Sequence, residues 1–582
     1  MFFCRLLMLC LVCVVNAVVL AQENELDPVT ISASLSPQKI SKTGRNIFVI
    51  KGEMFSKLPV NSIDDLLRYL PGMEVQARGP MGAQSDFVLR GGTFQQVLVI
   101  LDGVRLNDPN SGHFTSYIPI SPAEIERIEI LKGAASAIYG SEAVGGVVQI
   151  ITKTFAAKKN GTARNLLAQV VGGGYGLFNV NAGGFTSNGT TSVGAGVLSN
   201  NATGQQQRGT KGFFNNHTAS LSISHFINNN WQVALRSSYD DRRFAAQNFY
   251  TTFTSDTAAE RVKTFWNQLQ LIHTKDKTTT RLIAGYKALD DTYNFNSIGV
   301  PNRSKSKMWQ ALLTNEWKFK NQNSLTAGAQ FINKNIVSND RGNHNIKQVA
   351  GFLILNQRFA ENFFLSPALR VEWNERAGWE LIPQANVSYR INQLQLRASA
   401  GKTIRDADFT ERFNNYNKTL VTSGRIGNPD LQAEKSFSFE GGADYFIAKN
   451  LKISASYFQR NHTDLIDYVT TPYAEMPRKI NLVNTGTYAL AKNISTVKTR
   501  GLEADFQYTK TWTNSKELWA GVGFVYLNSK SSSPTPSFYI NSHARYLTNF
   551  AVHYKLKNFG LGVNGLYKER TPQTSTNAAI IK

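Results

Sequence analysis

From about Asn165 to near its C-terminus, the chain alternates apolar and polar residues with a period of two. In residues 309–319 one parity reads Trp, Ala, Leu, Asn, Trp, Phe, and the other reads Gln, Leu, Thr, Glu, Lys. Residues 325–331, 394–401 and 561–567 repeat the pattern. Successive side chains of a β-strand point to opposite faces, so this period predicts many strands with one apolar face.

Aromatic residues lie near the ends of these expected strands, among them Trp231, Tyr239, Trp309 and Trp317. Such positions are typical of the aromatic girdles of transmembrane β-barrels. The alternative is a soluble sandwich with one wet face. A sandwich of this length would normally divide into domains of roughly 100 residues. The uninterrupted alternation with polar loops of uneven length therefore favours an antiparallel transmembrane β-barrel.

The sequence pattern of residues 22–153 is different and is typical of a mixed α/β globular domain. Ser62 is a suitable N-cap for a helix that Pro71-Gly72 ends. Residues 121–124 (Ser-Pro-Ala-Glu) form a capping box with proline at the first helical position, which predicts a second helix. The apolar runs 97–101 and 145–151 predict strands.

The first 21 residues have the layout of a secretory signal peptide, with Arg5 before an almost wholly apolar run and a cleavage position before Gln22. All three cysteines, Cys4, Cys10 and Cys13, lie within it, and none follows a small residue as a lipoprotein anchor requires. The mature chain is therefore expected to contain no cysteine. It also has no apolar run of about 18 residues, which fits a strand-built membrane protein and a soluble periplasmic protein equally.

The formal charge of +22 is concentrated in the alternating part of the chain, because residues 26–153 carry 12 basic and 12 acidic side chains. A basic surface suits nucleic acid, an anionic surface or an anionic ligand. No nucleic-acid-binding motif accompanies the charge, so nucleic acid is not an expected partner. Exposed Lys and Arg facing anionic lipopolysaccharide or water is the favoured interpretation, which makes outer-membrane lipids an expected partner.

Three segments, 66–75, 88–107 and 125–153, resemble the plug domain of TonB-dependent outer-membrane receptors. Within that superfamily they are most similar to the cobalamin (vitamin B12) receptors and the small ferric-siderophore receptors. Residues 427–436 and 498–503 resemble barrel signatures of the same family. The resemblance implies an N-terminal α/β plug inside the lumen of a 22-stranded antiparallel barrel, in the outer membrane of a Gram-negative bacterium. It also implies TonB-dependent active import of a scarce nutrient.

The resemblance predicts four parts: signal peptide 1–21, periplasmic leader 22–35, plug 36–153 and barrel 154–582. Twenty-two strands would be tight in the last part, because each needs about 10 residues plus its turns and loops. The chain ends Ala-Ile-Ile-Lys, whereas family barrels end on an aromatic residue. We therefore expect the last two or three strands to be missing from this sequence.

The leader contains the segment that stands where the family has its TonB box, the site gripped by TonB of the inner-membrane energising complex. Val29 and Ile31 share one parity there, so the segment can add a strand to a partner sheet. The alternative is a plain linker. The predicted TonB box is Asp27, Pro28, Val29, Thr30 and Ile31.

In the family, arginines of the plug face glutamates on the inner barrel wall. Carried onto this sequence, that arrangement places Arg90 with Arg127 or Lys132 opposite Glu440 and Glu503, as a plug–barrel latch. A buried ionic cluster of this kind is a plausible registration device and weak evidence for stability. The alternative for Arg127 is an ordinary surface position on its helix.

Ligand recognition is expected on the apical loops of the plug, because surface loops are the usual place for binding residues. Segments 76–85 and 108–117 are turn-rich and polar. The compact chain and the plug similarity favour cobalamin or another corrinoid, whereas the basic barrel suits an anionic ferric chelate. The candidate ligand-binding residues are Gln76, Arg78, Gln84, Asn107, Asp108, Asn110, His113 and Tyr117.

Other classes of function find little support in the sequence. An enzyme would need a convergent site, and there is no paired-His zinc motif, phosphate loop or nucleophile elbow. No cofactor and no metal site are expected. Residues 240–241 and 290–291, both Asp-Asp, could bind calcium in outer loops, but solvated carboxylates are favoured because calcium needs six to eight converging oxygens. A passive porin or adhesin barrel would lack the plug and the TonB box.

Residues 404–413 depart from the family pattern, since they stand where many relatives have an Arg-Ala-Pro run and contain no proline.

Overall fold

The computed structural model describes residues 26–80, 82–207, 209–250, 253, 255–448, 450–494, 496–513, 516–532 and 542–570. The predicted signal peptide lies outside these residues. Within them, no helix is both long and apolar enough to cross a membrane.

The N-terminal domain is built on a five-stranded sheet in the order β3-β8-β9-β6-β7, with β6 and β9 parallel and the other pairs antiparallel. Its central strands bury apolar side chains, and Val99, Ile130 and Val148 are fully buried. The sheet strands are β3 (Ile47–Lys51), β6 (Val97–Leu101), β7 (Val104–Arg105), β8 (Ile125–Lys132) and β9 (Gly146–Thr152), and a separate hairpin joins β4 (Met73–Arg78) to β5 (Gln84–Leu89).

The predicted helix after Ser62 is confirmed as α2 (Ile63–Leu67), and the Ser62 hydroxyl accepts from the Asp65 backbone N–H. The capping box at Ser121 is also confirmed, but the helix predicted after it is wrong. One 3-10 turn, η5 (Pro122–Glu124), leads directly into β8. The alternating isoleucines of β8 pair with β3 and β9, and this sheet pairing overrides the local helix signal.

Short helical elements connect the strands. They are η1 (Ile40–Lys42), η2 (Gly52–Ser56), η3 (Phe94–Gln96), η4 (Gly112–Ser116), α3 (Ser136–Tyr139), η6 (Gly174–Gly176), η7 (Lys320–Gln322), α4 (Phe409–Phe413) and η8 (Tyr473–Glu475).

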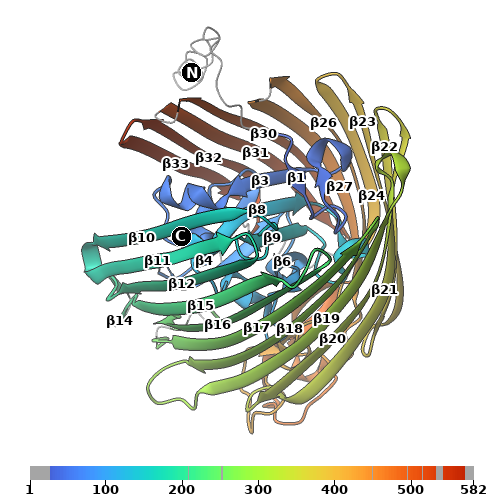
Figure 1. The fold of residues 1–582 in the computed structure, drawn as a ribbon. Helices are drawn as coiled ribbons and strands as arrows, with labels where there is room; N and C mark the ends of the chain where they lie inside the picture. Colours follow the sequence, from blue (N-terminus) through green and yellow to red (C-terminus); the bar gives the residue numbers. More distant parts are fainter. Residues whose placement is uncertain are drawn as a thin grey trace, which may run out of the picture.

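Within the described residues, nineteen antiparallel strands form one sheet. Figure 1 shows this sheet curling around the N-terminal domain. Neighbouring strands follow one another in chain order from β10 to β33. The expectation that this sequence lacks the last two or three strands of the barrel stays a prediction. The strands are β10 (Thr162–Gly173), β11 (Leu177–Asn188), β12 (Thr191–Ala202), β15 (Phe214–Phe226), β16 (Trp231–Ala245), β17 (Ala259–Lys275), β18 (Thr278–Asn294), β19 (Asn302–Lys318), β20 (Ser324–Ser338), β21 (Gly342–Ala360), β22 (Phe363–Asn374), β23 (Gly378–Ile391), β24 (Leu394–Arg405), β26 (Glu434–Ala448), β27 (Leu451–Thr463), β30 (Val497–Thr513), β31 (Lys516–Ser531), β32 (Ala544–Leu556) and β33 (Phe559–Arg570).

The alternation predicted from the sequence is confirmed. Trp309 and Leu313 of β19 are about half exposed on the outer face, whereas Met308 and Gln310, on either side of Trp309, are buried against the lumen. The core of the plug is continuous with inward barrel side chains such as Trp266 and Ile283. The sheet therefore holds the plug inside it and presents an apolar outer surface.

The two ends of the barrel differ. At the short-turn end, tight turns join pairs such as β17–β18, β23–β24 and β32–β33. At the long-loop end, long connections carry α4 and a three-stranded sheet. The small strands outside the barrel are β1 (Val29–Thr30), β2 (Gln38–Lys39), β13 (Gln206–Gln207), β14 (Thr210–Lys211), β25 (Arg425–Ile426), β28 (Leu465–Pro472) and β29 (Thr487–Ile494).

The acidic pairs considered for calcium lie within β16 and β18, not in outer loops as expected. Adjacent residues of a strand face opposite sides, so the two carboxylates of a pair cannot converge. Asp240 and Asp291 point inward, while Asp241 and Asp290 point outward to Arg261 and Lys305. The described residues contain no cluster of three or more potential metal ligands.

Candidate functional site at the plug–barrel interface

The predicted TonB box lies at the short-turn end and is partly ordered as a strand. Val29 and Thr30 form β1, which pairs antiparallel with β2. Val29 is 48% exposed, while Thr30 is buried. The segment is therefore docked on the plug along one side and open along the other.

A single buried carboxylate holds the end of this segment. Glu129 Oε2 of β8 accepts hydrogen bonds from the backbone N–H groups of Ile31 and Ser32, both at 3.0 Å. Its other oxygen accepts from Arg127 Nε at 2.8 Å. The Tyr139 hydroxyl of α3 donates to the Ser32 carbonyl at 3.0 Å. These contacts form a docking clamp (Glu129 and Tyr139) that fixes the segment to the plug.

The start of the segment is fixed separately. Asp27 accepts from the Ser41 backbone N–H at 2.8 Å and from its hydroxyl at 2.6 Å. Arg390 of the barrel lies 3.3 Å from the same carboxylate. The predicted TonB box thus contacts the plug and the barrel through Asp27 at its start, and Glu129 of the plug through Ile31 at its end.

Glu129→Gln is expected to loosen the box by about 2 kcal/mol, because two charge-assisted bonds become neutral ones of about half the strength. A nitroxide attached through Val29→Cys would report the change as a mobile component in its EPR spectrum. All cysteines of the sequence lie in its first 13 residues, before the predicted cleavage position, so labelling would be specific. Arg127→Gln is the matched control, since it keeps the carboxylate; equal spectra for Glu129→Gln and the unaltered chain would refute the clamp.

A second cluster lies deeper, between the plug and the inner barrel wall. Arg90 donates from Nε and Nη2 to Glu503 of β30, at 2.8 Å for the shorter contact, and from Nη1 to Glu440 of β26. Its guanidinium also lies 4.5 Å from the centre of the Phe458 ring. Burial opposes its charge, but Glu440 and Glu503 more than offset this and raise the pKa of Arg90 above its usual value.

The structure brings three of the predicted latch residues together, Arg90, Glu440 and Glu503. Lys132 lies beside them and forms its ion pair with Asp505 of β30 at 2.9 Å. Arg127 lies on β8 and pairs with Glu129 of the docking clamp.

Sequence reasoning missed Arg45, which is fully buried and 3.9 Å from Glu440. It donates to the Lys132 carbonyl at 2.9 Å, and burial lowers its pKa to about 10.

Two glycines permit the close approach of plug and barrel. A Cβ at Gly133 would lie 3.1 Å from a carboxylate oxygen of Glu440, and one at Gly140 would lie 2.7 Å from the Arg370 guanidinium. Both residues have positive φ, which disfavours any side chain.

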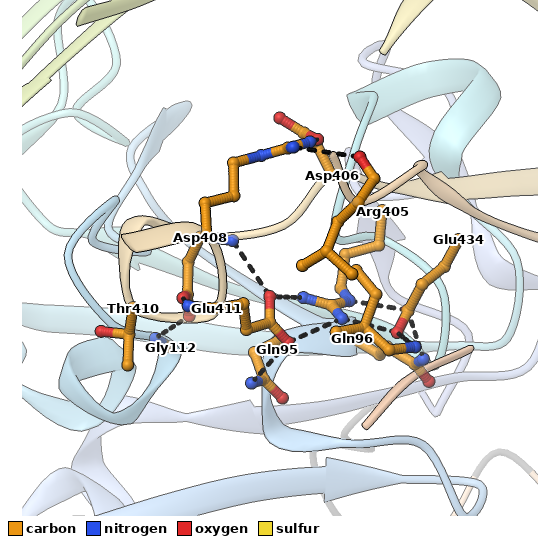
Figure 2. A network of polar contacts seen from close by, with 12 residues as sticks. Gln95, Gln96, Gly112, Arg405, Asp406, Asp408, Thr410, Glu411 and Glu434 are labelled. Atoms are coloured by element: carbon orange, nitrogen blue, oxygen red, sulfur yellow. Dashed lines mark hydrogen bonds and ion pairs between the residues drawn. The ribbon is translucent and has the colours of Figure 1, made fainter. Parts of the chain in front are cut away.

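A third network ties the plug to the long-loop end, and Figure 2 shows it in close view. Arg405, at the end of β24, contacts both oxygens of Glu411 at 2.7 and 3.0 Å and both oxygens of Glu434 at 2.5 and 2.6 Å. Gln96 of the plug donates to Glu434 at 2.8 Å, and Gln95 donates to Glu411 at 3.4 Å. The segment that departs from the family pattern thus joins the barrel to η3.

The same loop covers the apical plug segment. Asp408 caps α4 and also accepts from the Gly112 backbone N–H at 3.2 Å. The Thr410 N–H donates to the Asn110 carbonyl at 3.2 Å, and the Phe409 N–H to the Pro109 carbonyl at 2.9 Å. These hydrogen bonds join α4 to residues 109–112 of the plug.

Six of the eight candidate ligand-binding residues are buried. Asp108 pairs with Lys287 at 2.9 Å, and Asn110 donates to Asp291 at 3.3 Å. His113 stacks on Phe94 and lies 2.8 Å from Asp86, while burial lowers its pKa to about 4, so its imidazole is neutral at pH 7.

Of the five remaining candidates, three are buried and two are partly buried. Gln84 bonds to the Tyr250 hydroxyl at 3.1 Å, and Tyr117 is buried with the Arg242 guanidinium 4.7 Å from its ring centre. Asn107 bonds to the backbone of Val97 and Val99 and so braces the plug sheet. Gln76 and Arg78 are only partly buried.

Family models match most of the chain. The model described as "TonB dependent receptor-like, beta-barrel" matches residues 159–580, and the "TonB-dependent Receptor Plug Domain" model matches residues 39–147.

Similar curated proteins include two vitamin B12 transporters, BtuB. That of Photobacterium profundum is 23% identical over 74% of this chain and 69% of its own length. That of Vibrio cholerae is 24% identical over 77% and 73%.

Solved structures with the same fold include the siderophore receptor PirA of Pseudomonas aeruginosa, with a TM-score of 0.66 at 17% identity over 89% of this chain and 92% of that one. A variant of the ferric enterobactin receptor PfeA of P. aeruginosa, in complex with enterobactin, gives a TM-score of 0.71 at 15% identity over 90% and 87%.

Proposed function

Because this chain belongs to the family of TonB-dependent receptors, we propose that it imports cobalamin or a related corrinoid across the outer membrane of a Gram-negative bacterium. In this proposal the long-loop end faces the outside and the short-turn end faces the periplasm. TonB, energised by its inner-membrane complex, is the partner at the short-turn end. No catalytic role is proposed.

The observation that carries the choice of substrate is the similarity to two vitamin B12 transporters over about three quarters of the chain. The solved siderophore receptors share the fold at identities of 15–17% and therefore say less about the ligand. A ferric siderophore is the second candidate, supported by the excess of basic residues in the barrel part.

Coupling follows from the positions of the three networks. Ligand arriving at the outer loops would first meet the α4 segment, whose backbone bonds reach Pro109 and Asn110 of the plug. The latch lies below, and the docked TonB box lies at the far end. Release of Ile31 and Ser32 from Glu129 would free two backbone donors, which an added strand of TonB can use.

A pulling force would then act on the plug through the chain after Ile31. The central sheet of the plug has no covalent tie to the barrel beyond the chain itself, so polar clusters such as Arg90–Glu440–Glu503 set the resistance to movement. A passive porin or adhesin would need neither the docked segment nor the plug.

The experiment that tests the proposal is uptake of labelled cobalamin and of labelled ferric siderophores by cells that make the receptor, with and without Ile31→Pro. Proline removes the backbone donor needed for strand addition, so uptake is expected to fall on the order of tenfold or more. Uptake of cobalamin alone would support the proposed substrate, and uptake of a ferric siderophore alone would replace it.

Two matched variants separate coupling from docking. Ile31→Ala keeps the N–H, and Glu129→Gln loosens the docked segment without removing a donor from it. Both are expected to retain most of the uptake that Ile31→Pro loses. Undiminished uptake in Ile31→Pro would reject the TonB-box assignment and favour a passive channel.

A further inference from the structure

Six basic side chains of β16, β17 and β19 gather on the outer face of the barrel, at the long-loop end. On β16, β17 and β19 every outward ionisable residue of this zone is basic except Asp241, and β18 adds Asp290. The side chains of Lys305 and Arg261 are 70% and 50% exposed. The basic patch consists of Arg243, Arg261, Lys263, Arg303, Lys305 and Lys307.

The two carboxylates only partly balance the patch. Asp241 lies 2.6 Å from Arg261, and Asp290 lies 3.8 Å from Lys305. Six basic and two acidic groups leave an excess of four positive charges.

The patch is bounded on both sides. At the same level of β20 the outward residues are Asn333, Asn335 and Val337, and those of β15 are Asn215 and His217. No outward lysine or arginine therefore adjoins the patch on β15 or β20.

An aromatic belt lies directly below the patch. Tyr239, Phe265 and Trp309 are 45%, 45% and 56% exposed on the same outward face. Asp241, Lys263 and Lys307 each lie two residues from one of these aromatic residues on the same strand. The charged and the aromatic side chain of each pair are therefore roughly 7 Å apart along the strand. Aromatic side chains in this position mark the boundary between acyl chains and headgroups. The basic patch is thus level with the headgroups of the outer leaflet.

Two shallow apolar grooves continue from the belt down the outer face. One, of about 610 Å³, lies over small side chains including Ala195, Ala219 and Ser237, with Phe265 at its rim. The other, of about 560 Å³, adjoins it at Leu221 and reaches Trp309. Small residues flanked by large ones leave hollows that chain-like apolar groups can fill.

We propose that the basic patch and the two grooves form a binding site for a phosphorylated lipid of the outer leaflet that carries several acyl chains. The ammonium and guanidinium groups would bind the phosphates, and the grooves would take acyl chains. A water-soluble protein partner would have no use for grooves below the aromatic belt. The inference rests on the outer-membrane location proposed above and is independent of the transported ligand.

The test uses the purified full chain in detergent, titrated with bisphosphorylated hexa-acylated lipid A and with its phosphate-free counterpart, and analysed by native mass spectrometry. The unaltered chain is expected to bind the phosphorylated form at least about tenfold more tightly. Equal binding of the two lipids would overturn the proposal, whatever any variant does.

The variant Lys263→Gln, Lys305→Gln, Lys307→Gln is expected to lose most of that preference. Its matched control, Lys275→Gln, Lys277→Gln, Lys320→Gln, changes three exposed lysines at the opposite end of the barrel and is expected to keep it. A triple variant that binds phosphorylated lipid like the unaltered chain would overturn the proposal, as would an equal loss in the control. Cobalamin uptake does not enter this measurement, so failure here is distinct from failure of the proposed transport.

Discussion

Arg90→Met is expected to weaken the hold of the barrel on the plug by about 3–5 kcal/mol, because it leaves two buried carboxylates without their main cation. Glu440 and Glu503 are 7% and 3% exposed, and Arg90 contacts both. Arg45 is 3.9 Å from Glu440 and supplies only partial compensation. The measurement is hydrogen–deuterium exchange of plug peptides in increasing urea, which gives the free energy of plug opening.

The triple variant Arg90→Met, Glu440→Gln, Glu503→Gln separates the charge from the shape of the cluster. Replacing a whole buried ionic cluster by neutral groups is often nearly neutral, so much of the lost protection is expected to return. Arg127→Met is the control, since that arginine is partly exposed and pairs within the plug. Unchanged protection in Arg90→Met, or no recovery in the triple variant, would show that the cluster does not secure the plug.

The barrel was predictable because a period of two dictates which face of a strand each residue occupies. Trp309 and Leu313 lie outward and Gln310 lies inward, as the alternation of residues 309–319 predicts. The same rule rejects the acidic pairs as calcium sites, once those residues are known to be in strands. The local sequence around Asp240-Asp241 could not show whether these residues lie in a loop or in a strand.

Local signals failed where a distant strand decides the outcome. The capping box at Ser121 is real, yet the chain forms one 3-10 turn before β8 because residues 125–132 pair with β3 and β9. A helix signal three residues long cannot outweigh two ladders of backbone hydrogen bonds.

The candidate site was predictable only in part. Arg90, Glu440 and Glu503 were named through a family resemblance, and their contacts span 350 and 413 residues of sequence. No pattern near Arg45 or Asp505 marks either residue as part of a buried cluster. Their partners follow from the register of barrel strands against the plug, which no local periodicity encodes.

The outer network contains a carboxyl group, that of Glu411, whose pKa is raised. Glu411 lies in a loop beyond the strands, and burial, reinforced by Asp408 and Glu434, raises the pKa of its carboxyl although Arg405 lowers it. Arg405 is therefore the group that opposes the effect of burial on Glu411, and its two hydrogen bonds hold that side chain in place.

Arg405→Met is expected to release α4 from the plug by about 3–5 kcal/mol at pH 8, since Glu411 and Glu434 are 2% and 0% exposed and share this guanidinium. Loss of the cation raises the pKa of Glu411 further above its value in an undocked loop. The docked form then binds more protons than the undocked form, so docking is strongest at low pH and is lost as the pH rises. Hydrogen–deuterium exchange of peptides covering 405–413, at pH 6 and pH 8, is the measurement.

The double variant Arg405→Met, Glu411→Gln removes the titrating group and is expected to exchange at similar corrected rates at both pH values. Arg425→Met, a partly buried arginine of the same loop that stacks on Tyr468, serves as the control and should leave α4 docked. Equal protection of α4 at pH 6 and pH 8 in Arg405→Met would show that protonation of Glu411 does not control the docking of α4. If α4 stayed docked at both, the backbone bonds from Phe409 and Thr410 to Pro109 and Asn110 would suffice, and the loop would follow the plug without Arg405.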